Sequence, residues 1–266
     1  MSVQTPARRS AWFAVLTDRR MVSLFFVVLV VVPSFLLLAR WQVHRLDERK
    51  AANSIVTTNE AKPTVPVDAV MTAGANPNVV GDDLQWRHIT ATGYYDQTAT
   101  QLVRQRTQDG SNGYWVMTPL VTAHGVLAVN RGWIAAGASA VTSPTVPAAP
   151  TGTVSVLGRV QPTEDAGPRP LDLPIGQVTD LDVRAVAASG QVYPGYLQLL
   201  SSTPAETGNP VLLSIPEPPL DDGPHLSYAL QWVTFAFIAI GGFVVLLRGE
   251  ARRRREDEEE LVSQLV

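Results

Sequence analysis

Two uncharged apolar stretches near opposite ends of the chain constrain its fold more than any other feature. They cover residues 22–39 and 229–247 of 266, and neither contains Asp, Glu, Lys or Arg. Because an α-helix rises about 1.5 Å per residue, about 20 apolar residues match the hydrocarbon core of a bilayer, which is about 30 Å thick. The sequence therefore predicts a membrane protein with two transmembrane helices and a domain between them.

The first stretch is expected to stay in the protein as an anchor. It is longer than the apolar region of a secretory signal peptide, and residues 38–42 lack the small-x-small pattern of a cleavage site. Arg8-Arg9 is a poor match to a twin-arginine signal, because the apolar run begins about a dozen residues later. We therefore expect both helices in the membrane.

Basic residues precede the first apolar stretch and follow the second. They are Arg8, Arg9, Arg19, Arg20, Arg248 and the run 252–255. Because cytoplasmic loops carry an excess of Lys and Arg, both ends of the chain are expected in the cytoplasm. Residues 40–50 are also basic, so the first helix alone is ambiguous. The second helix decides the orientation, because Asp221 and Asp222 precede it with no Lys or Arg nearby.

The predicted organisation has five parts. They are a cytoplasmic segment (1–20), a transmembrane helix (21–41), an extracytoplasmic domain (42–227), a second transmembrane helix (228–247) and a cytoplasmic charged tail (248–266). Apolar residues at 12–16 favour a short interfacial helix, and the Arg and Glu residues at 252–260 favour a solvated helix with i,i+4 ion pairs. Membrane anchoring explains the basic residues, with binding of anionic lipid or a partner as the alternative.

The central domain changes from helical to β-type patterning. The first helix is expected to continue as a polar stalk to Asn59, before Pro63 and Pro66 stop it. Short runs rich in β-branched and aromatic residues then predict strands at 86–95, 101–106, 114–119, 126–133, 154–160 and 193–200. A helix is predicted at 180–188, with Thr179 as its N-cap and Gly190 just beyond its end.

Turn residues indicate how neighbouring strands pair. Residues 109–113 and 123–125 carry the Asp-Gly, Asn-Gly and His-Gly chemistry of tight turns, which predicts antiparallel β-hairpins. A Rossmann or P-loop domain is excluded, because neither a βαβ alternation nor a phosphate-binding glycine loop occurs. We therefore expect two transmembrane helices flanking an extracytoplasmic, mainly antiparallel β (α+β) domain, built as a compact sheet or a partly closed barrel.

Composition excludes several classes of function. The formal net charge of -3 gives no electrostatic reason to expect nucleic acid as a partner. Cys is absent, which excludes thiolate catalysis, Cys-linked haem and Cys-based zinc or copper sites. No two of His44, His88, His124 and His225 lie at helical ligand spacing with a carboxylate, and Ser227 is not in a G-x-S-x-G turn. The chain is not expected to be an enzyme.

The segment 126–134 is the most distinctive part of the domain. An apolar strand runs into Asn130, Arg131, Gly132 and Trp133. One interpretation is a strand end at which Gly132 permits a bend and Arg131 pairs with a carboxylate. The other is an Arg and a Trp presented to a partner or to an anionic group.

The outer ends of the two apolar stretches carry polar and aromatic residues. Anchoring at the membrane surface explains the aromatic residues, which are Trp41, Tyr228 and Trp232. It explains Gln42, Gln231 and His225 less well, because polar groups beside hydrocarbon need a partner inside the protein. We therefore place the candidate site at these outer ends.

Four motifs occur in order along the chain. They are Trp-Gln-Val-His-Arg-Leu at 41–46 with Lys50, Gly-Tyr-Trp-Val-Met-Thr-Pro-Leu at 113–120, Val-Asn-Arg-Gly-Trp at 129–133, and His-Leu-Ser-Tyr-Ala-Leu-Gln-Trp at 225–232. With the two-span layout, they resemble the surfeit-locus (Surf-one) family over about residues 20–247. The chain looks like a bacterial, actinobacterial-like member. The N-terminal tail, residues 167–174 and the charged tail lie outside the resemblance.

The resemblance implies an assembly factor of haem-copper (aa3-type) cytochrome c oxidase in the bacterial plasma membrane. Family members are thought to assist haem a insertion into subunit I, and some bacterial members bind haem a. His225 matches the family's histidine, a proposed haem ligand. The resemblance then implies transient haem a at His225, and its predicted surroundings are Trp41, Tyr228 and Trp232 as packing walls and Arg45 or Arg131 as propionate partners. The alternatives are a His225 that bonds to a neighbouring carbonyl, or a His44/His225 ligand pair.

Two other classes of function fit the topology. A structural subunit would pack on the oxidase or a respiratory supercomplex without a cofactor, and Gln42, Asn130, Trp133 and Gln231 would then be protein contacts. An extracytoplasmic sensor or binding module is the second alternative, although only about 20 residues at each end leave little room for a cytoplasmic output domain.

Overall fold

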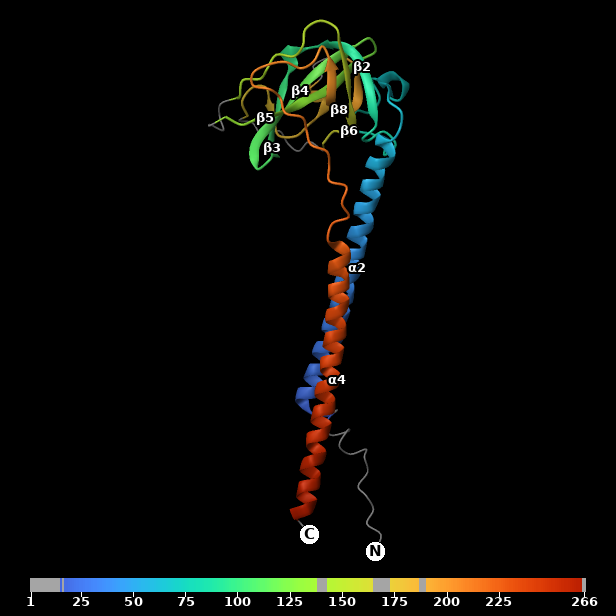
Figure 1. Cartoon of the computed structure of the whole chain (residues 1–266), viewed down its shortest axis with the longest axis vertical. Helices are drawn as coiled ribbons and strands as arrows, with labels where there is room; N and C mark the ends of the chain where they lie inside the picture. Colours follow the sequence, from blue (N-terminus) through green and yellow to red (C-terminus); the bar gives the residue numbers. More distant parts are fainter. Residues whose placement is uncertain (1–14, 16, 138–142, 165–172, 187–189, 265–266) are drawn as a thin grey trace. The chain divides into compact units, whose positions relative to one another are not determined.

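The computed structural model describes residue 15 and residues 17–137, 143–164, 173–186 and 190–264 (Figure 1). The chain forms two compact units. The hairpin unit comprises Met1–Ala51 and Asp221–Val266, and the sheet unit comprises Ala52–Leu220. The predicted interfacial helix at 12–16, apart from Val15, lies outside the described residues, as does most of the segment 167–174.

Each apolar stretch lies within a longer helix. Helix α2 covers Arg19–Glu60 and helix α4 covers His225–Gln264. The predicted stalk is confirmed, because α2 continues unbroken past Asn59. Both helices are long and apolar enough to cross a membrane. The protein buries 0% of the most apolar 18-residue segment of α2 and 6% of that of α4. Neither is therefore the buried core helix of a soluble domain.

Helices α2 and α4 run side by side in the hairpin unit (Figure 1). Four buried alanines, Ala39, Ala229, Ala236 and Ala251, lie on the helices. Such small side chains allow two helix backbones to approach closely. Phe35 adds aromatic contacts, because its ring lies 5.6 Å from that of Trp232 and 5.9 Å from that of Phe235. Packing between apolar side chains thus aligns the two helices.

Ion pairs form where both helices reach the charged segments. Asp18 binds Arg254 at 2.5 Å, and Arg254 also binds Glu250 at 2.9 Å. Arg252 and Glu256 form a further i,i+4 pair at 2.8 Å. The predicted helix with i,i+4 pairs in the charged tail is therefore confirmed.

The sheet unit contains an eight-stranded sheet. Its strands are β1 (Val65–Pro66), β2 (His88–Tyr95), β3 (Gln101–Gln108), β4 (Ser111–Thr122), β5 (Val126–Ala135), β6 (Val154–Gln161), β7 (Gln177–Val178) and β8 (Val192–Thr203). Short helical turns are η1 (Val67–Ala69), η2 (Gln97–Ala99) and α3 (Val183–Val186). All six strands predicted from the sequence are present, and the two short strands β1 and β7 were not predicted.

The strand order is β1-β2-β6-β8-β5-β4-β3-β7, and β2 also pairs with β4. The pairings therefore run in a closed circuit through β2, β6, β8, β5 and β4. The predicted β3–β4 and β4–β5 hairpins are antiparallel, as expected. The sheet is nevertheless mixed, because β1–β2, β3–β7 and β5–β8 are parallel. Turn residues specify only neighbouring strands, so the sequence did not reveal these parallel pairs.

Two predicted elements begin later than expected. Trp86 lies in a turn with a positive φ of 67° before β2 begins, and its amide donates to the carbonyl of Val160 at 2.8 Å. Helix α3 covers four residues, whereas the prediction spanned 180–188, of which 187–189 lie outside the described residues. Asp182 accepts from the Arg184 amide at 2.9 Å, and the predicted cap Thr179 donates to Asp180 instead.

The core of the sheet unit is built on both faces of β5, whose residues are all buried except Ala135. Leu127 and Val129 join one cluster with residues of β2, β6 and β8, whereas Ala128 joins a second cluster with Val103 and Met117. Alternate residues of a strand point to opposite faces, so a strand buried on both faces favours a nearly continuous apolar run. The long apolar run at the start of β5 fits this pattern.

An ion pair is buried beside this core. Arg131 on β5 has a side chain that is 1% exposed, and its Nη2 lies 2.5 Å from Oε2 of Glu206. Its Nε donates to Oε1 of Glu206 at 3.0 Å, and its Nη1 donates to the carbonyl of Pro147 at 3.2 Å. The guanidinium also lies 5.7 Å from the ring of Tyr95. These contacts join β5 to two loops that are distant in sequence.

We expect Glu206→Gln to lower the free energy of unfolding by about 3 kcal/mol, because it leaves the buried Arg131 charge without its counter-ion. Denaturation of the purified protein in detergent micelles, followed by tryptophan fluorescence, measures the change.

Glu217→Gln is the matched control for this prediction. Glu217 also pairs with a buried arginine, Arg159, but Glu60 lies 2.9 Å from the same guanidinium and remains after the substitution. The loss should be about 1 kcal/mol or less. Equal losses of unfolding free energy in the two variants would show that the Arg131–Glu206 pair stabilises the fold no more than the Arg159–Glu217 pair does.

Tyr193 is expected to make the free energy of unfolding depend on pH in the alkaline range. Its fully buried hydroxyl donates to Asp68, and burial followed by this hydrogen bond raises the pKa of the phenol to about 12. Between pH values of about 10 and 12, the folded chain keeps a proton that the unfolded chain releases, so the free energy of unfolding falls as pH rises. Tyr193→Phe should flatten this slope by up to about one proton. Denaturation curves at several alkaline pH values test this, and an identical slope in both proteins contradicts it.

Candidate functional site at the outer end of the helical hairpin

One hydrogen bond joins the first residue of α4 to α2 across 183 positions of sequence. Nδ1 of His225 lies 2.9 Å from Oε1 of Gln42, and both side chains are half-buried. Because the amide oxygen can only accept, this arrangement places the imidazole proton on Nδ1. In the neutral form of the ring, Nε2 then carries the lone pair, which makes it the potential metal ligand.

The turn before α4 brings Gly223 close to the imidazole of His225. Gly223 has a φ of +66°, and a Cβ built on it would lie 3.4 Å from Nε2 and 3.3 Å from Cδ2 of His225. Its amide donates to the side chain of Asp221 at 2.9 Å, and Nε of Arg49 donates to the carbonyl of Asp221 at 3.1 Å. The turn is thus tied to α2, and a side chain at position 223 would lie against the imidazole.

The donor set fits a haem with one protein ligand. A neutral histidine is a common axial ligand, and ligating histidines usually donate their second ring N–H to a carbonyl or carboxylate oxygen. Gln42 supplies such an oxygen to His225. Among the residues that the structure describes, no group of three or more His, Asp or Glu is placed to hold a metal ion. A single-histidine site therefore fits better than a multidentate metal centre.

The aromatic residues predicted near His225 differ in their surroundings. Trp41 and Tyr228 are 54% and 47% exposed, so their rings are open to a ligand or a partner. Trp232 stacks on Phe35 and is half-buried, so its ring belongs to the packing between the helices. Two of the three predicted walls are accordingly on the surface.

The other polar residues predicted near His225 on these helices are exposed. Arg45 lies one helical turn from Gln42, is exposed and pairs with Glu48 at 2.7 Å. Gln231 is exposed on α4. His44 is exposed and lies about 200° around α2 from Gln42, since successive helical residues turn by about 100°. The His44/His225 pair is therefore not formed, and Gln42 is the partner instead.

The predicted residues of the sheet unit are buried. Arg131 is 5% exposed, Trp133 5% and Asn130 1%. Arg131 forms the ion pair with a carboxylate that one interpretation of the sequence predicts, and its partner is Glu206. Nε1 of Trp133 donates to the carbonyl of Arg106 at 2.6 Å. A Cβ on Gly132 would lie 2.6 Å from the carbonyl of Leu213, so the glycine allows two backbones to meet. These residues hold the sheet unit together and offer little surface to a partner.

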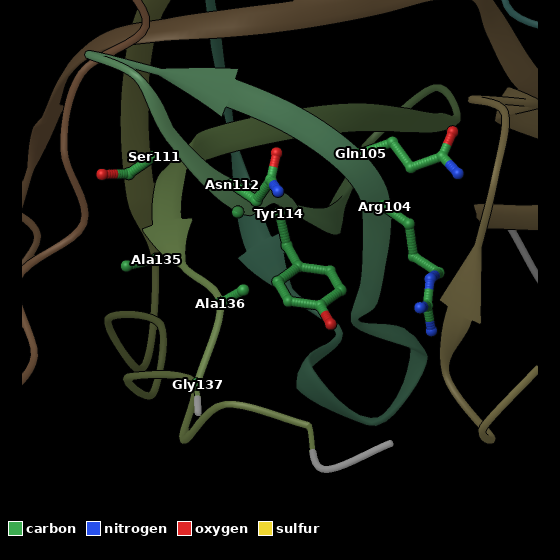
Figure 2. Close-up of a pocket in the computed structure, with 9 residues that line it drawn as sticks. Arg104, Gln105, Ser111, Asn112, Tyr114, Ala135, Ala136 and Gly137 are labelled. Atoms are coloured by element: carbon green, nitrogen blue, oxygen red, sulfur yellow. The ribbon is translucent and has the colours of Figure 1, made fainter. Parts of the chain in front are cut away.

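A pocket of about 570 Å³ in the sheet unit lies beside the β3–β4 hairpin and the end of β5 (Figure 2). A bulge shapes it, because Arg104 and Gln105 together oppose Tyr114 alone, and Gln105 has a φ of 58°. Nη1 of Arg104 donates to Gln177 at 2.6 Å. The described lining residues include no carboxylate or imidazole, so the pocket lacks an acid–base pair. Sequence patterns did not reveal it, because the turn residues mark the hairpin but not the bulge.

Sequence reasoning also missed the role of Gly223. The run Asp221-Asp222-Gly223-Pro224 is typical of a turn, and this signal was visible. Its position beside Nε2 of His225 depends on the packing of the turn against α2.

Comparison with known proteins agrees with the family resemblance of the four sequence motifs. The SURF1 family model matches residues 29–237. The chain is 30% identical over 230 residues to uncharacterized SURF1-like proteins of Mycobacterium bovis and Mycobacterium tuberculosis, with 84% of this chain and 82% of each relative covered. The matched region includes both Gln42 and His225. The chain therefore belongs to the SURF1 family.

Proposed function

We propose that the protein crosses the bacterial plasma membrane twice, with both ends in the cytoplasm and the sheet unit outside. Two helices of sufficient length, with apolar surfaces that are not buried by the protein, support this placement. The arginines outside each apolar stretch support the orientation. Members of the SURF1 family are known generally as oxidase assembly factors, and we extend this role to the present chain as a non-catalytic assembly factor of haem-copper cytochrome c oxidase.

The specific role we propose is to hold haem a transiently at His225 before insertion into subunit I. The observation that carries this proposal is the bond between Nδ1 of His225 and Gln42, which uses Nδ1 and leaves Nε2 as the ring atom for a ligand. Bound haem would supply the iron that the imidazole ligates and the macrocycle that is handed on. The end of an apolar helix suits such a ligand, because the macrocycle is apolar and its propionates are anionic.

Exposed residues near His225 would complete the site. Trp41 and Tyr228 offer aromatic rings for the face or edge of a macrocycle. Arg45 is the cation for a propionate, because its pairing with Glu48 is exposed and therefore weak. Arg131 is not included, since its guanidinium is buried on Glu206. Gln231 and the exposed apolar side chains of both helices would face oxidase subunits or lipid.

The first test uses the full-length protein purified in detergent. We expect the wild type to carry haem, and His225→Ala to lose at least about 90% of the haem absorbance, whereas the control His44→Ala keeps it. Pyridine haemochrome analysis identifies the haem type, and thermal unfolding checks that both variants are folded.

Co-purification separates the proposed role from a structural one. Haem bound without stoichiometric oxidase supports a chaperone. A protein without haem that co-purifies stoichiometrically with the oxidase would favour a scaffold and overturn the haem proposal. Equal haem content in His225→Ala and the wild type would show that His225 is not the haem ligand.

The second test addresses the geometry around the imidazole. Gln42→Leu removes the acceptor for Nδ1–H, and we expect haem affinity to fall by about 10- to 100-fold. Gly223→Ala places a methyl group beside Nε2 and should lower haem affinity comparably. Titration of haem into the apo-protein, followed by its absorbance spectrum, measures both effects.

Matched controls isolate the local cause. Gln231→Leu removes an exposed amide from α4, and Gly110→Ala places alanine at a φ of +76° where nothing lies within 4 Å of the new Cβ. Both should bind haem as the wild type does. If Gly110→Ala weakens haem binding as much as Gly223→Ala, backbone strain rather than crowding of Nε2 would account for the loss.

A further inference from the structure

An apolar groove lies between α2 and α4 at the end of the hairpin opposite His225. Its volume is about 350 Å³, and its lining residues are Met21, Val22, Phe25, Phe243 and Leu247. The rings of Phe25 and Phe243 lie 6.1 Å apart across it. Every lining side chain is apolar, so water gains no hydrogen-bond partner from side chains in this groove.

Three arginines stand where the groove meets the charged ends of the helices. Arg19 and Arg20 directly precede the lining residue Met21, and Arg248 directly follows Leu247. All three side chains are exposed. Within the described part of the chain they form no ion pair or side-chain hydrogen bond, whereas Arg254 further along α4 binds Asp18 and Glu250. Positive charge that no described carboxylate pairs with is therefore concentrated at one end of an apolar groove.

This combination calls for an amphiphile with a long apolar chain and an anionic head. Arginine binds phosphate strongly, because its planar fork can donate two parallel hydrogen bonds. Basic segments next to a membrane span attract anionic lipids at the cytoplasmic leaflet. A lipid with a zwitterionic head carries its own cation and gains less from the arginines.

We propose that the groove binds one acyl chain of an anionic phospholipid from the surrounding bilayer, with its phosphate among Arg19, Arg20 and Arg248. The inference rests on the membrane placement proposed above but not on haem binding. The lipid would fill the space between the two helices and act as part of the hairpin unit.

The test uses the full-length protein, stripped of lipid in mild detergent and then mixed with phosphatidylglycerol or phosphatidylcholine of identical acyl chains. Native mass spectrometry counts the retained lipids. We expect one phosphatidylglycerol to be retained at a concentration about tenfold lower than phosphatidylcholine requires. Its binding should also raise the melting temperature of the protein.

Two variants address the two parts of the site. Arg20→Gln combined with Arg248→Gln should abolish the preference for phosphatidylglycerol, and Val22→Trp should fill the groove and reduce retention of both lipids. The matched controls are Arg40→Gln, an exposed arginine at the other end of the apolar stretch, and Val27→Trp, an exposed position that does not line the groove. Both controls should behave as the wild type does.

Equal retention of the two lipids by the wild type would overturn the proposal, as would equal effects of Val22→Trp and Val27→Trp. His225→Ala should keep the lipid, so loss of haem and loss of lipid are separate results. A protein found in the soluble fraction that retains neither lipid would instead overturn the membrane placement on which the inference rests.

Discussion

The packing of α2 against α4 is the contact on which the candidate sites depend. Small residues such as Ala39 and Ala229 bring the backbones together, and the stacked rings of Phe35 and Trp232 lie along the same contact. Only this alignment brings Gln42 to His225, because 183 residues separate them in the sequence. The contact between Gln42 and His225 therefore depends on apolar packing between the two helices.

The two ends of this contact differ in chemistry. At one end, Gln42 binds Nδ1 of His225 and Gly223 lies beside Nε2, with the exposed rings of Trp41 and Tyr228 on the same two helices. At the other, apolar side chains line a groove that ends at arginines. Polar groups beside an apolar helix are costly unless they are paired or used, and charges at its ends interact with water or lipid heads. Under the two proposals above, the same hairpin would carry two ligands of different kinds.

The sheet unit shows why distinctive residues need not be functional. Asn130, Arg131 and Trp133 resemble a binding motif in sequence, yet each is buried. Arg131 is neutralised by Glu206, which lies 75 residues away, and Gly132 admits the backbone of Leu213. A buried charge must be paired, so the strand end could be interpreted correctly only with its distant partners known.

The sequence alone determined the two apolar helices, the stalk, the six main strands, the two β-hairpins and the family motifs, including His225. These features rest on local signals, namely apolar runs, alternation and turn residues. Tertiary structure decided the parallel β5–β8 pair, the closed circuit of strands, the choice of Gln42 over His44 and the place of Gly223 beside Nε2. Each of these depends on segments that meet only through packing, and local patterns do not record such contacts.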